Sequence, residues 1–214
     1  MGILWALLMR SALPIRYDYL APFYVMLMIL LGAISQMVFV WILIALAALD
    51  TEHLWLPNMI TYPGITLGVI VTITSRFVFG LYSDDLTVPY LSPIWSAIFV
   101  SLISVILAAA LILLIRWIYW LIRKQEGLGL GDAKLMALLA AWLGLPLTLL
   151  SFVLAIFLGS LTAVALLAIP SAKRASPNWA MSKLPLGTFL CIGGIVSSLW
   201  GQPILNAYLR WAGF

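Results

Sequence analysis

Five long stretches of this 214-residue chain contain no Asp, Glu, Lys, Arg or His, and cover residues 19–49, 54–75, 86–115, 135–172 and 184–209. A helix needs about 20 apolar residues to cross a bilayer, so each stretch is long enough to span it. The chain is 65% hydrophobic and 8% charged, whereas soluble domains are about half apolar and a quarter charged. The sequence therefore predicts an all-α polytopic transmembrane bundle and excludes a soluble enzyme, a disordered chain and an ordinary nucleic-acid binder.

Two of these stretches are long enough to hold two helices each. The sequence Gly144-Leu145-Pro146 is typical of a tight turn and divides the fourth stretch. In the first stretch, Ser35-Gln36 interrupts an otherwise apolar run, and we expect two short helices that meet near Ser35. The bundle then has about seven helices, within a range of six to eight. We assign residues 1–18 to a short cytoplasmic or interfacial segment and residues 19–214 to the transmembrane domain.

The basic residues orient the bundle, because cytoplasmic loops of membrane proteins carry an excess of Lys and Arg. Arg123 and Lys173 lie in basic connections, whereas the connection at Asp84 has no Lys or Arg. We therefore expect the first two connections, together with the one that follows Asp50, in the cytoplasm and the Asp84 connection outside. The net charge of +4 reflects this placement and predicts no nucleic-acid partner.

Four of the seven acidic residues form two pairs at predicted cytoplasmic helix ends: Asp50 with Glu52, and Glu126 with Asp132. Two predicted crossings separate the pairs, so both return to the same side of the membrane. A carboxylate at the membrane boundary is costly unless water, a partner or a function keeps it there. These acids are therefore either solvated headgroup neighbours or parts of a site.

The residues around each pair favour a site. Pro57 and Asn58 follow Asp50 and are typical of a helix break and the cap of the next helix. Glycines alternate through residues 126–135 and end at Asp132, which lets another backbone approach closely. Glycines alone are a weak signal, because membrane helices also use them for packing.

These segments resemble the two motifs of the type IV prepilin peptidases, membrane aspartyl proteases of the Gly-x-Gly-Asp class. Asp50, residues 56–58, Thr61 and Pro63 match the first motif, and residues 126–135 match the second with Leu128 in place of Met. Residues 185–189 are similar to a family Pro-Phe-Gly-Pro-Phe segment with two substitutions. The resemblance implies that Asp50 and Asp132 are the catalytic pair.

The resemblance also implies the reaction: the basic leader peptide of a type IV prepilin-like or pseudopilin substrate is cut off at the cytoplasmic face of the bacterial inner membrane. Type IV pilus assembly and protein secretion use such substrates. The supporting motif residues are Pro57, Asn58, Gly129, Gly131 and Lys134. Glu52 and Glu126 are candidates for substrate contact or for tuning the pair. The partners implied are the substrate protein and the lipid bilayer.

The single cysteine, Cys191, separates this sequence from bifunctional members of the family. Those members carry a cytoplasmic domain with two Cys-x-x-Cys pairs, a zinc-binding arrangement that is linked to N-methyltransferase activity. Methyl transfer by this chain is therefore doubtful, and peptidase activity is the sharper prediction. The sequence contains no metal-ligand cluster, so we expect an enzyme without a metal or another cofactor.

The aspartyl mechanism needs one ionised carboxylate and one protonated carboxyl group. Asp132 begins a predicted helix, where the helix dipole favours a negative charge, and Asp50 lies near the end of one. We therefore expect Asp50 to hold the shared proton and Asp132 to be the base, although coupling within the pair can override the dipole.

Three other readings of the acids remain open. A protease of the presenilin type has Tyr-Asp in its first motif and a Pro-Ala-Leu tripeptide, whereas here Leu49 precedes Asp50 and the tripeptide is absent. A transporter with an acid-lined path needs polar residues near mid-membrane, where this sequence has almost none. An inactive relative that retains the motifs for packing is the third reading.

Overall fold

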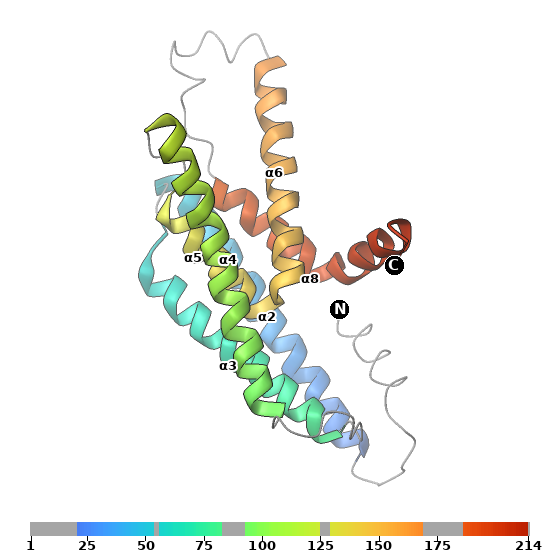
Figure 1. The fold of residues 1–214 in the computed structure, drawn as a ribbon. Coiled ribbons are helices and arrows are strands. Elements are labelled where there is room, and N and C mark those ends of the chain that lie inside the picture. The colour runs from blue at the N-terminus through green and yellow to red at the C-terminus, as the bar shows by residue number, and fades with distance from the viewer. Residues whose placement is uncertain (1–20, 54–55, 83–92, 125–128, 169–185, 214) are drawn as a thin grey trace.

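The computed structural model describes residues 21–53, 56–82, 93–124, 129–168 and 186–213. Every regular element in these ranges is a helix (Figure 1), namely α2 (Ala21–His53), α3 (Asn58–Tyr82), α4 (Pro93–Arg123), α5 (Leu130–Leu143), α6 (Leu145–Ala168) and α8 (Leu186–Trp211). The predicted all-α bundle is confirmed. The predicted N-terminal segment, the Asp84 and Lys173 connections and Glu126 lie outside the described residues.

Within the described residues, four helices contain segments that are long and apolar enough to cross a membrane. These segments are Ile29–Glu52, Ile98–Arg123, Leu145–Ala165 and Leu186–Trp211. Many large apolar side chains on these helices are exposed in the isolated chain, among them Trp41 and Ile106. Such an apolar exterior fits a lipid environment, and the chain is a multi-pass membrane protein.

The expected break near Ser35 is wrong, because α2 continues through this position as a single helix of 33 residues. The Ser35 hydroxyl donates to the Gly32 carbonyl at 2.9 Å, and the Gln36 amide donates to the Ser198 hydroxyl of α8 at 2.8 Å. Both polar side chains thus find partners without interrupting the helical hydrogen bonds. The described residues form six helices, so the expected number of seven was approximate.

The expected turn between α5 and α6 is confirmed at Gly144. This residue has φ of +74°, a conformation that glycine adopts without steric cost. Its N–H donates to the Ala140 carbonyl at 3.0 Å, and its own carbonyl accepts the Thr148 hydroxyl at 2.7 Å. The turn lets α6 begin one residue after Gly144.

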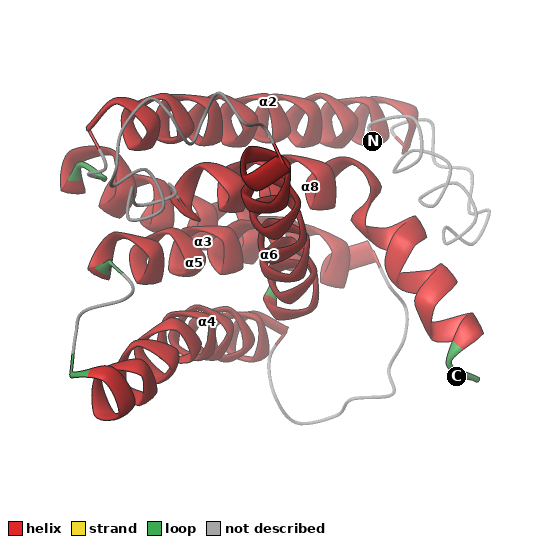
Figure 2. Cartoon of the chain, turned by 90° about the horizontal axis from the view of Figure 1, so that it is seen from above, coloured by secondary structure: helices red, strands yellow, loops and turns green. Residues whose placement is uncertain are grey.

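Helix α5 forms the centre of the bundle and packs against α3, α4, α6 and α8, as Figures 1 and 2 show from two directions. Its residues from Leu135 to Ala141 are all buried. Trp142 stacks on Phe39 of α2 with ring centroids 5.0 Å apart and donates its indole N–H to the Gly64 carbonyl of α3 at 2.9 Å. A helix that is apolar all round and enclosed in this way is a core element. Its position in the bundle determines where the residues at its N-terminus lie.

Candidate active site

Asp50 lies in the last turn of α2 and is only 6% exposed. Its Oδ2 accepts the backbone N–H of Thr188 at 2.7 Å and the Thr188 hydroxyl at 3.1 Å. Thr188 is the third residue of α8, and the first N–H groups of a helix have no partner within that helix. The Asp50 carboxyl group therefore caps the N-terminus of α8.

Gly187 allows this close contact. A Cβ atom at position 187 would lie 2.7 Å from Asp50 Oδ2, 2.8 Å from Cγ and 3.0 Å from Oδ1. Any side chain larger than hydrogen would thus collide with the carboxyl group. The sequence resemblance covered residues 185–189 but assigned no role to Gly187 or Thr188. A glycine followed by a hydroxyl residue at a helix start is the signal that could have identified them.

Asp132 lies in the first turn of α5, as its motif predicts. Its Oδ2 accepts the backbone N–H of Gly129 at 3.3 Å, so the side chain helps to cap its own helix. Gly131 provides a close approach, because a Cβ atom there would lie 3.0 Å from Leu56 Cδ1. Gly131 thus lets the start of α5 lie against the connection between α2 and α3.

The charge on Asp50 affects the carboxyl group of Asp132. Asp132 lies outside the spanning segments, and burial of its carboxyl group raises its pKa from 3.8 to about 6. The hydrogen bond from Gly129 opposes this pKa shift, and the charge on Asp50 adds to it. The direction is opposite to the one expected from the helix dipole, because the cost of burying a charge is larger.

The supporting motif residues tie the N-termini of α3 and α5 together. Lys134 Nζ donates to Asn58 Oδ1 at 2.6 Å and lies 5.4 Å from the centroid of the Tyr62 ring. The Pro57 carbonyl accepts the N–H of Thr61 at 3.2 Å and the Thr61 hydroxyl at 2.7 Å. Asn58 and Lys134 therefore join α3 to α5, the helix that carries Asp132, and Pro57 accepts hydrogen bonds in the first turn of α3.

Glu52 is exposed on the last turn of α2, two residues beyond Asp50. Its partner candidate Glu126 lies in the part of the chain that the structure leaves undescribed. Among the described residues, no group of three or more His, Cys, Asp or Glu side chains is placed to hold a metal ion.

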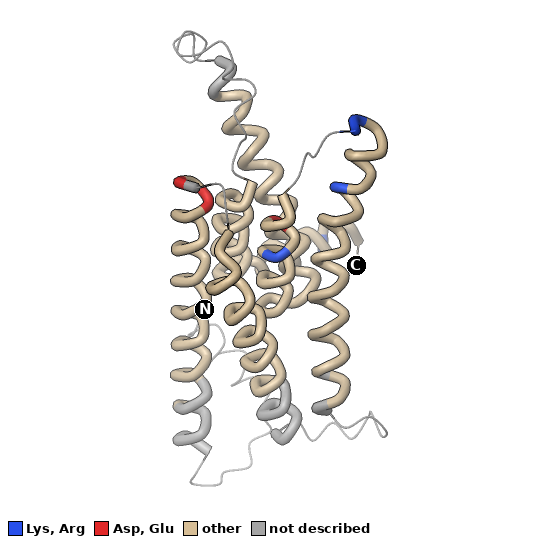
Figure 3. Tube along the Cα trace, turned by 90° about the vertical axis from the view of Figure 1, so that its left-hand side faces the viewer, with Lys and Arg blue, Asp and Glu red and all other residues tan. Residues whose placement is uncertain are grey.

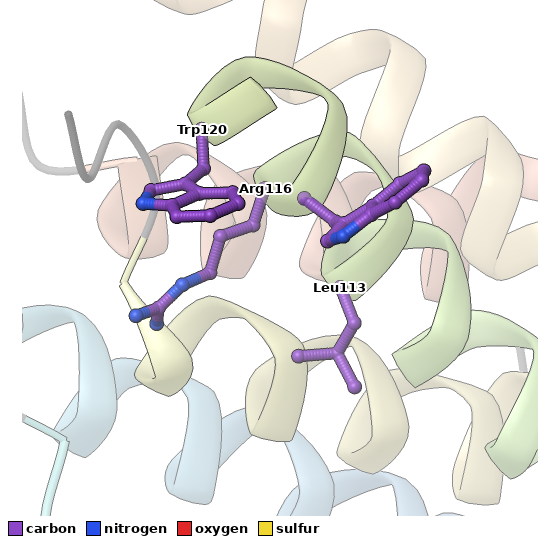
Figure 4. A pocket seen from close by; sticks show the side chains of 4 residues that line it. Leu113, Arg116 and Trp120 are labelled. Atoms are coloured by element: carbon purple, nitrogen blue, oxygen red, sulfur yellow. The ribbon is translucent and has the colours of Figure 1, made fainter. Parts of the chain in front are cut away.

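Most charged residues of the described chain lie toward the same end of the bundle as the aspartates (Figure 3). On α4 a pocket of about 320 Å³ is lined by Leu113, Arg116, Trp117 and Trp120 (Figure 4). Both tryptophans are about half exposed. An arginine beside tryptophans at the end of a spanning helix is typical of the membrane–water interface. Neither aspartate lines this pocket.

Comparisons with known proteins agree with the motifs. A family model described as the type IV leader peptidase family matches residues 37–164, a range that includes both aspartates. Two similar proteins are named prepilin leader peptidase/N-methyltransferase. The one from Pseudomonas aeruginosa is 31% identical over 84% of this chain and 54% of its own length. The one from Pseudomonas putida is 36% identical over 81% of this chain and 52% of its own length. The chain thus spans about half the length of these relatives. No solved structure matches it.

Proposed function

The chain belongs to the type IV leader peptidase family, and we propose that it is a membrane aspartyl endopeptidase. Its substrate is a type IV prepilin-like or pseudopilin protein, from which it removes the basic leader peptide. One observation carries the proposal: the charge on Asp50 of α2 adds to the raised pKa of Asp132 of α5, although the two residues are far apart in sequence. Paired carboxyl groups with different surroundings are what aspartyl hydrolysis requires.

In the proposed reaction Asp50 is the base and Asp132 carries the proton. Asp50 removes a proton from water, the water oxygen bonds to the scissile carbonyl carbon, and Asp132 donates its proton to the carbonyl oxygen. The C–N bond of the resulting diol then breaks. Asp50 passes its proton to the leaving nitrogen, and Asp132 regains a proton from a diol oxygen. One water is consumed, and both aspartates return to their starting states.

This assignment reverses the one expected from the helix dipole. Two observations support it: the pKa of Asp132 is raised to about 6, and Asp50 Oδ2 accepts two hydrogen bonds from Thr188. A carboxyl group with a pKa of about 6 keeps its proton to a higher pH than an ordinary carboxyl group does, which suits it to act as the acid. Hydrogen-bond donors directed at a carboxylate stabilise its charged form.

We place the enzyme in the bacterial inner membrane with the aspartates facing the cytoplasm. Most basic residues of the described chain lie toward the end of the bundle that carries the aspartates (Figure 3), which supports this orientation under the positive-inside rule. Residues 19–214 then form the transmembrane peptidase domain, and residues 1–18 form a short interfacial segment. An apolar substrate helix would partition into the bilayer and leave its basic leader beside the acids.

Co-expression with a prepilin-like substrate tests the proposal. We expect the wild-type chain to yield the shortened substrate, and Asp50→Asn and Asp132→Asn each to leave it at full length on an immunoblot. Asp85→Asn makes the same chemical change in an acid outside both motifs and should leave processing intact. Processing by either site variant at the wild-type rate would exclude the aspartyl pair.

We propose that the chain acts as a peptidase without methyl transfer, because its single cysteine, Cys191, leaves no Cys-x-x-Cys pair. Mass spectrometry of the new substrate N-terminus measures this directly. We expect an unmethylated terminus when this chain is the only processing enzyme present. A mass increase of one methyl group in the same cells would contradict the expectation and leave the peptidase proposal unaffected.

A further inference from the structure

We propose that Thr188 is a positioning residue that fixes the orientation of the Asp50 carboxyl group. By holding Oδ2, Thr188 leaves Oδ1 as the oxygen that removes a proton from water. The inference rests on the proposed aspartyl chemistry and adds to the catalytic pair a residue from a third helix. Neither motif that contains an aspartate includes Thr188.

The hydrogen bonds provide the first argument. Thr188 directs its backbone N–H at 2.7 Å and its hydroxyl at 3.1 Å toward the same oxygen of Asp50. The hydroxyl also lies 3.5 Å from the Ala47 carbonyl, a longer contact than the one to Oδ2. Two donors from one residue resist rotation of the carboxyl group, and hydrogen bonds to a charged group are stronger than neutral ones.

Packing provides the second argument, because Gly187 lies directly against the carboxyl group. The position of a Cβ atom there would be within 3.0 Å of Oδ1, Oδ2 and Cγ of Asp50. The Asp50 side chain is also almost fully buried. The carboxyl group is therefore confined by the start of α8 on one side while Thr188 holds one of its oxygens.

Both hydrogen bonds depend on the residue at position 188. A proline there would have neither an N–H group nor a hydroxyl and could make neither bond. Within the described residues, Thr188 therefore supplies both donors to Asp50 Oδ2.

Steady-state kinetics of the full chain, with a purified prepilin-like substrate, tests the inference. Thr188→Val retains the shape and the N–H but loses the hydroxyl, whereas Thr188→Ser retains both donors. We expect Thr188→Val to lower kcat about tenfold with KM within about twofold of wild type, since the lost bond orients the base and does not bind substrate. Thr188→Ser should recover most of kcat.

Thr66→Val is the matched control, because the Thr66 hydroxyl is exposed and donates to the Pro63 carbonyl at 2.9 Å. It should leave kcat and KM unchanged. If Thr188→Val retains the wild-type kcat, or if Thr188→Ser is as impaired as Thr188→Val, the positioning role is excluded. Asp50→Asn in the same assay separates a failure of the positioning role from a failure of the proposed function. Full activity of Asp50→Asn would exclude the aspartyl peptidase function itself.

Discussion

Asp132 lies at a helix N-terminus, where the dipole favours a negative charge, yet its pKa is raised to about 6. The magnitudes explain the result. A helix dipole contributes about 0.3–1 kcal/mol at such a position, whereas a shift of this size corresponds to roughly 3 kcal/mol. Burial therefore outweighs the dipole. The sequence places the residue at the helix start, but only the packed structure shows how far the carboxyl group is removed from water.

The rate of substrate cleavage should fall as pH rises through about 6, because the raised pKa of Asp132 means that its protonated form is lost above that value. In the proposed mechanism only the protonated form donates to the carbonyl oxygen. We expect kcat/KM to decrease by roughly tenfold per pH unit above that point. The measurement is a pH–rate profile of the reconstituted enzyme, and a profile that stays flat to pH of about 8 would contradict the assignment.

Asp132→Asn should increase stability at alkaline pH and not at acidic pH. In the folded chain the pKa of Asp132 is about 6, above its ordinary value of 3.8, so the folded state binds the proton more tightly. Wild-type stability therefore falls as pH rises between these values, by up to about 3 kcal/mol. Asn carries no charge and avoids this loss. Thermal unfolding of the wild type and the variant in detergent, at pH of about 4 and about 8, measures this difference. An equal change in stability at both pH values would refute the prediction.

Glycines set the spacing between the helices. Trp142 of α5 fits against α3 because a Cβ atom at Gly68 would lie 2.4 Å from its ring. On α8, a Cβ atom at Gly193 would lie 2.4 Å from the Ser151 backbone oxygen of α6. Small residues at membrane helix interfaces allow such close backbone approach. The precise placement of α5, which carries Asp132, and of α8, which supplies Thr188 to Asp50, depends on these contacts.

Gly193→Ala should destabilise the bundle by about 1–3 kcal/mol, because the added methyl group meets backbone that cannot move aside cheaply. Gly32→Ala is the matched control, since nothing lies within 4 Å of a Cβ atom at that helical position. It should be neutral or stabilise by about 0.5–1 kcal/mol. Thermal unfolding monitored by circular dichroism compares the stabilities of the two variants. Equal effects would show that helix propensity, and not packing, determines the change in stability.

Lys134→Gln and Asn58→Ala should be non-additive, because the two side chains share a hydrogen bond of 2.6 Å between α5 and α3. A double-mutant cycle on stability isolates the shared contribution. We expect a coupling energy of about 0.5–1 kcal/mol, since the bond is exposed to solvent. Strict additivity would mean that the bond does not stabilise the junction of the two helices.

Structural features that depend on neighbouring residues are predicted well from the sequence. Features that depend on contacts with residues distant in the sequence are predicted poorly. The turn at Gly144 is predicted by its own residues and is confirmed. The break at Ser35-Gln36 is not found, because Gln36 bonds to Ser198 of α8, a partner that is distant in sequence. Thr188 was missed for the same reason, since its role depends on Asp50 of another helix.

At the scale of the whole molecule, charged and apolar side chains occupy different parts of the bundle. Most basic residues of the described chain lie toward the same end of the bundle as the aspartates, as Figure 3 shows. The helices between the ends present apolar side chains to the exterior. This division supports one orientation in the membrane, because basic residues are retained on the cytoplasmic side.

Thr51→Cys and Trp95→Cys should react from opposite sides of the membrane when Cys191 is replaced by Ala. Thr51 is exposed beside Asp50, and Trp95 is exposed near the start of α4. With a thiol reagent that cannot cross membranes, intact spheroplasts should label only Trp95→Cys. Permeabilised cells should label both. Labelling of Thr51→Cys in intact spheroplasts would contradict the proposed orientation.

The groups that meet at Asp50 and Asp132 come from the first, middle and last helices that the structure describes, because α8 supplies Thr188. A ribosome releases these helices one after another, so the earlier ones are in the membrane while α8 is still being made. Until α8 arrives, nothing on the nascent chain supplies the Thr188 donors to Asp50. Synthesis of α8 thus becomes the event that fixes the proposed catalytic group, and a chain interrupted before α8 remains without these hydrogen bonds.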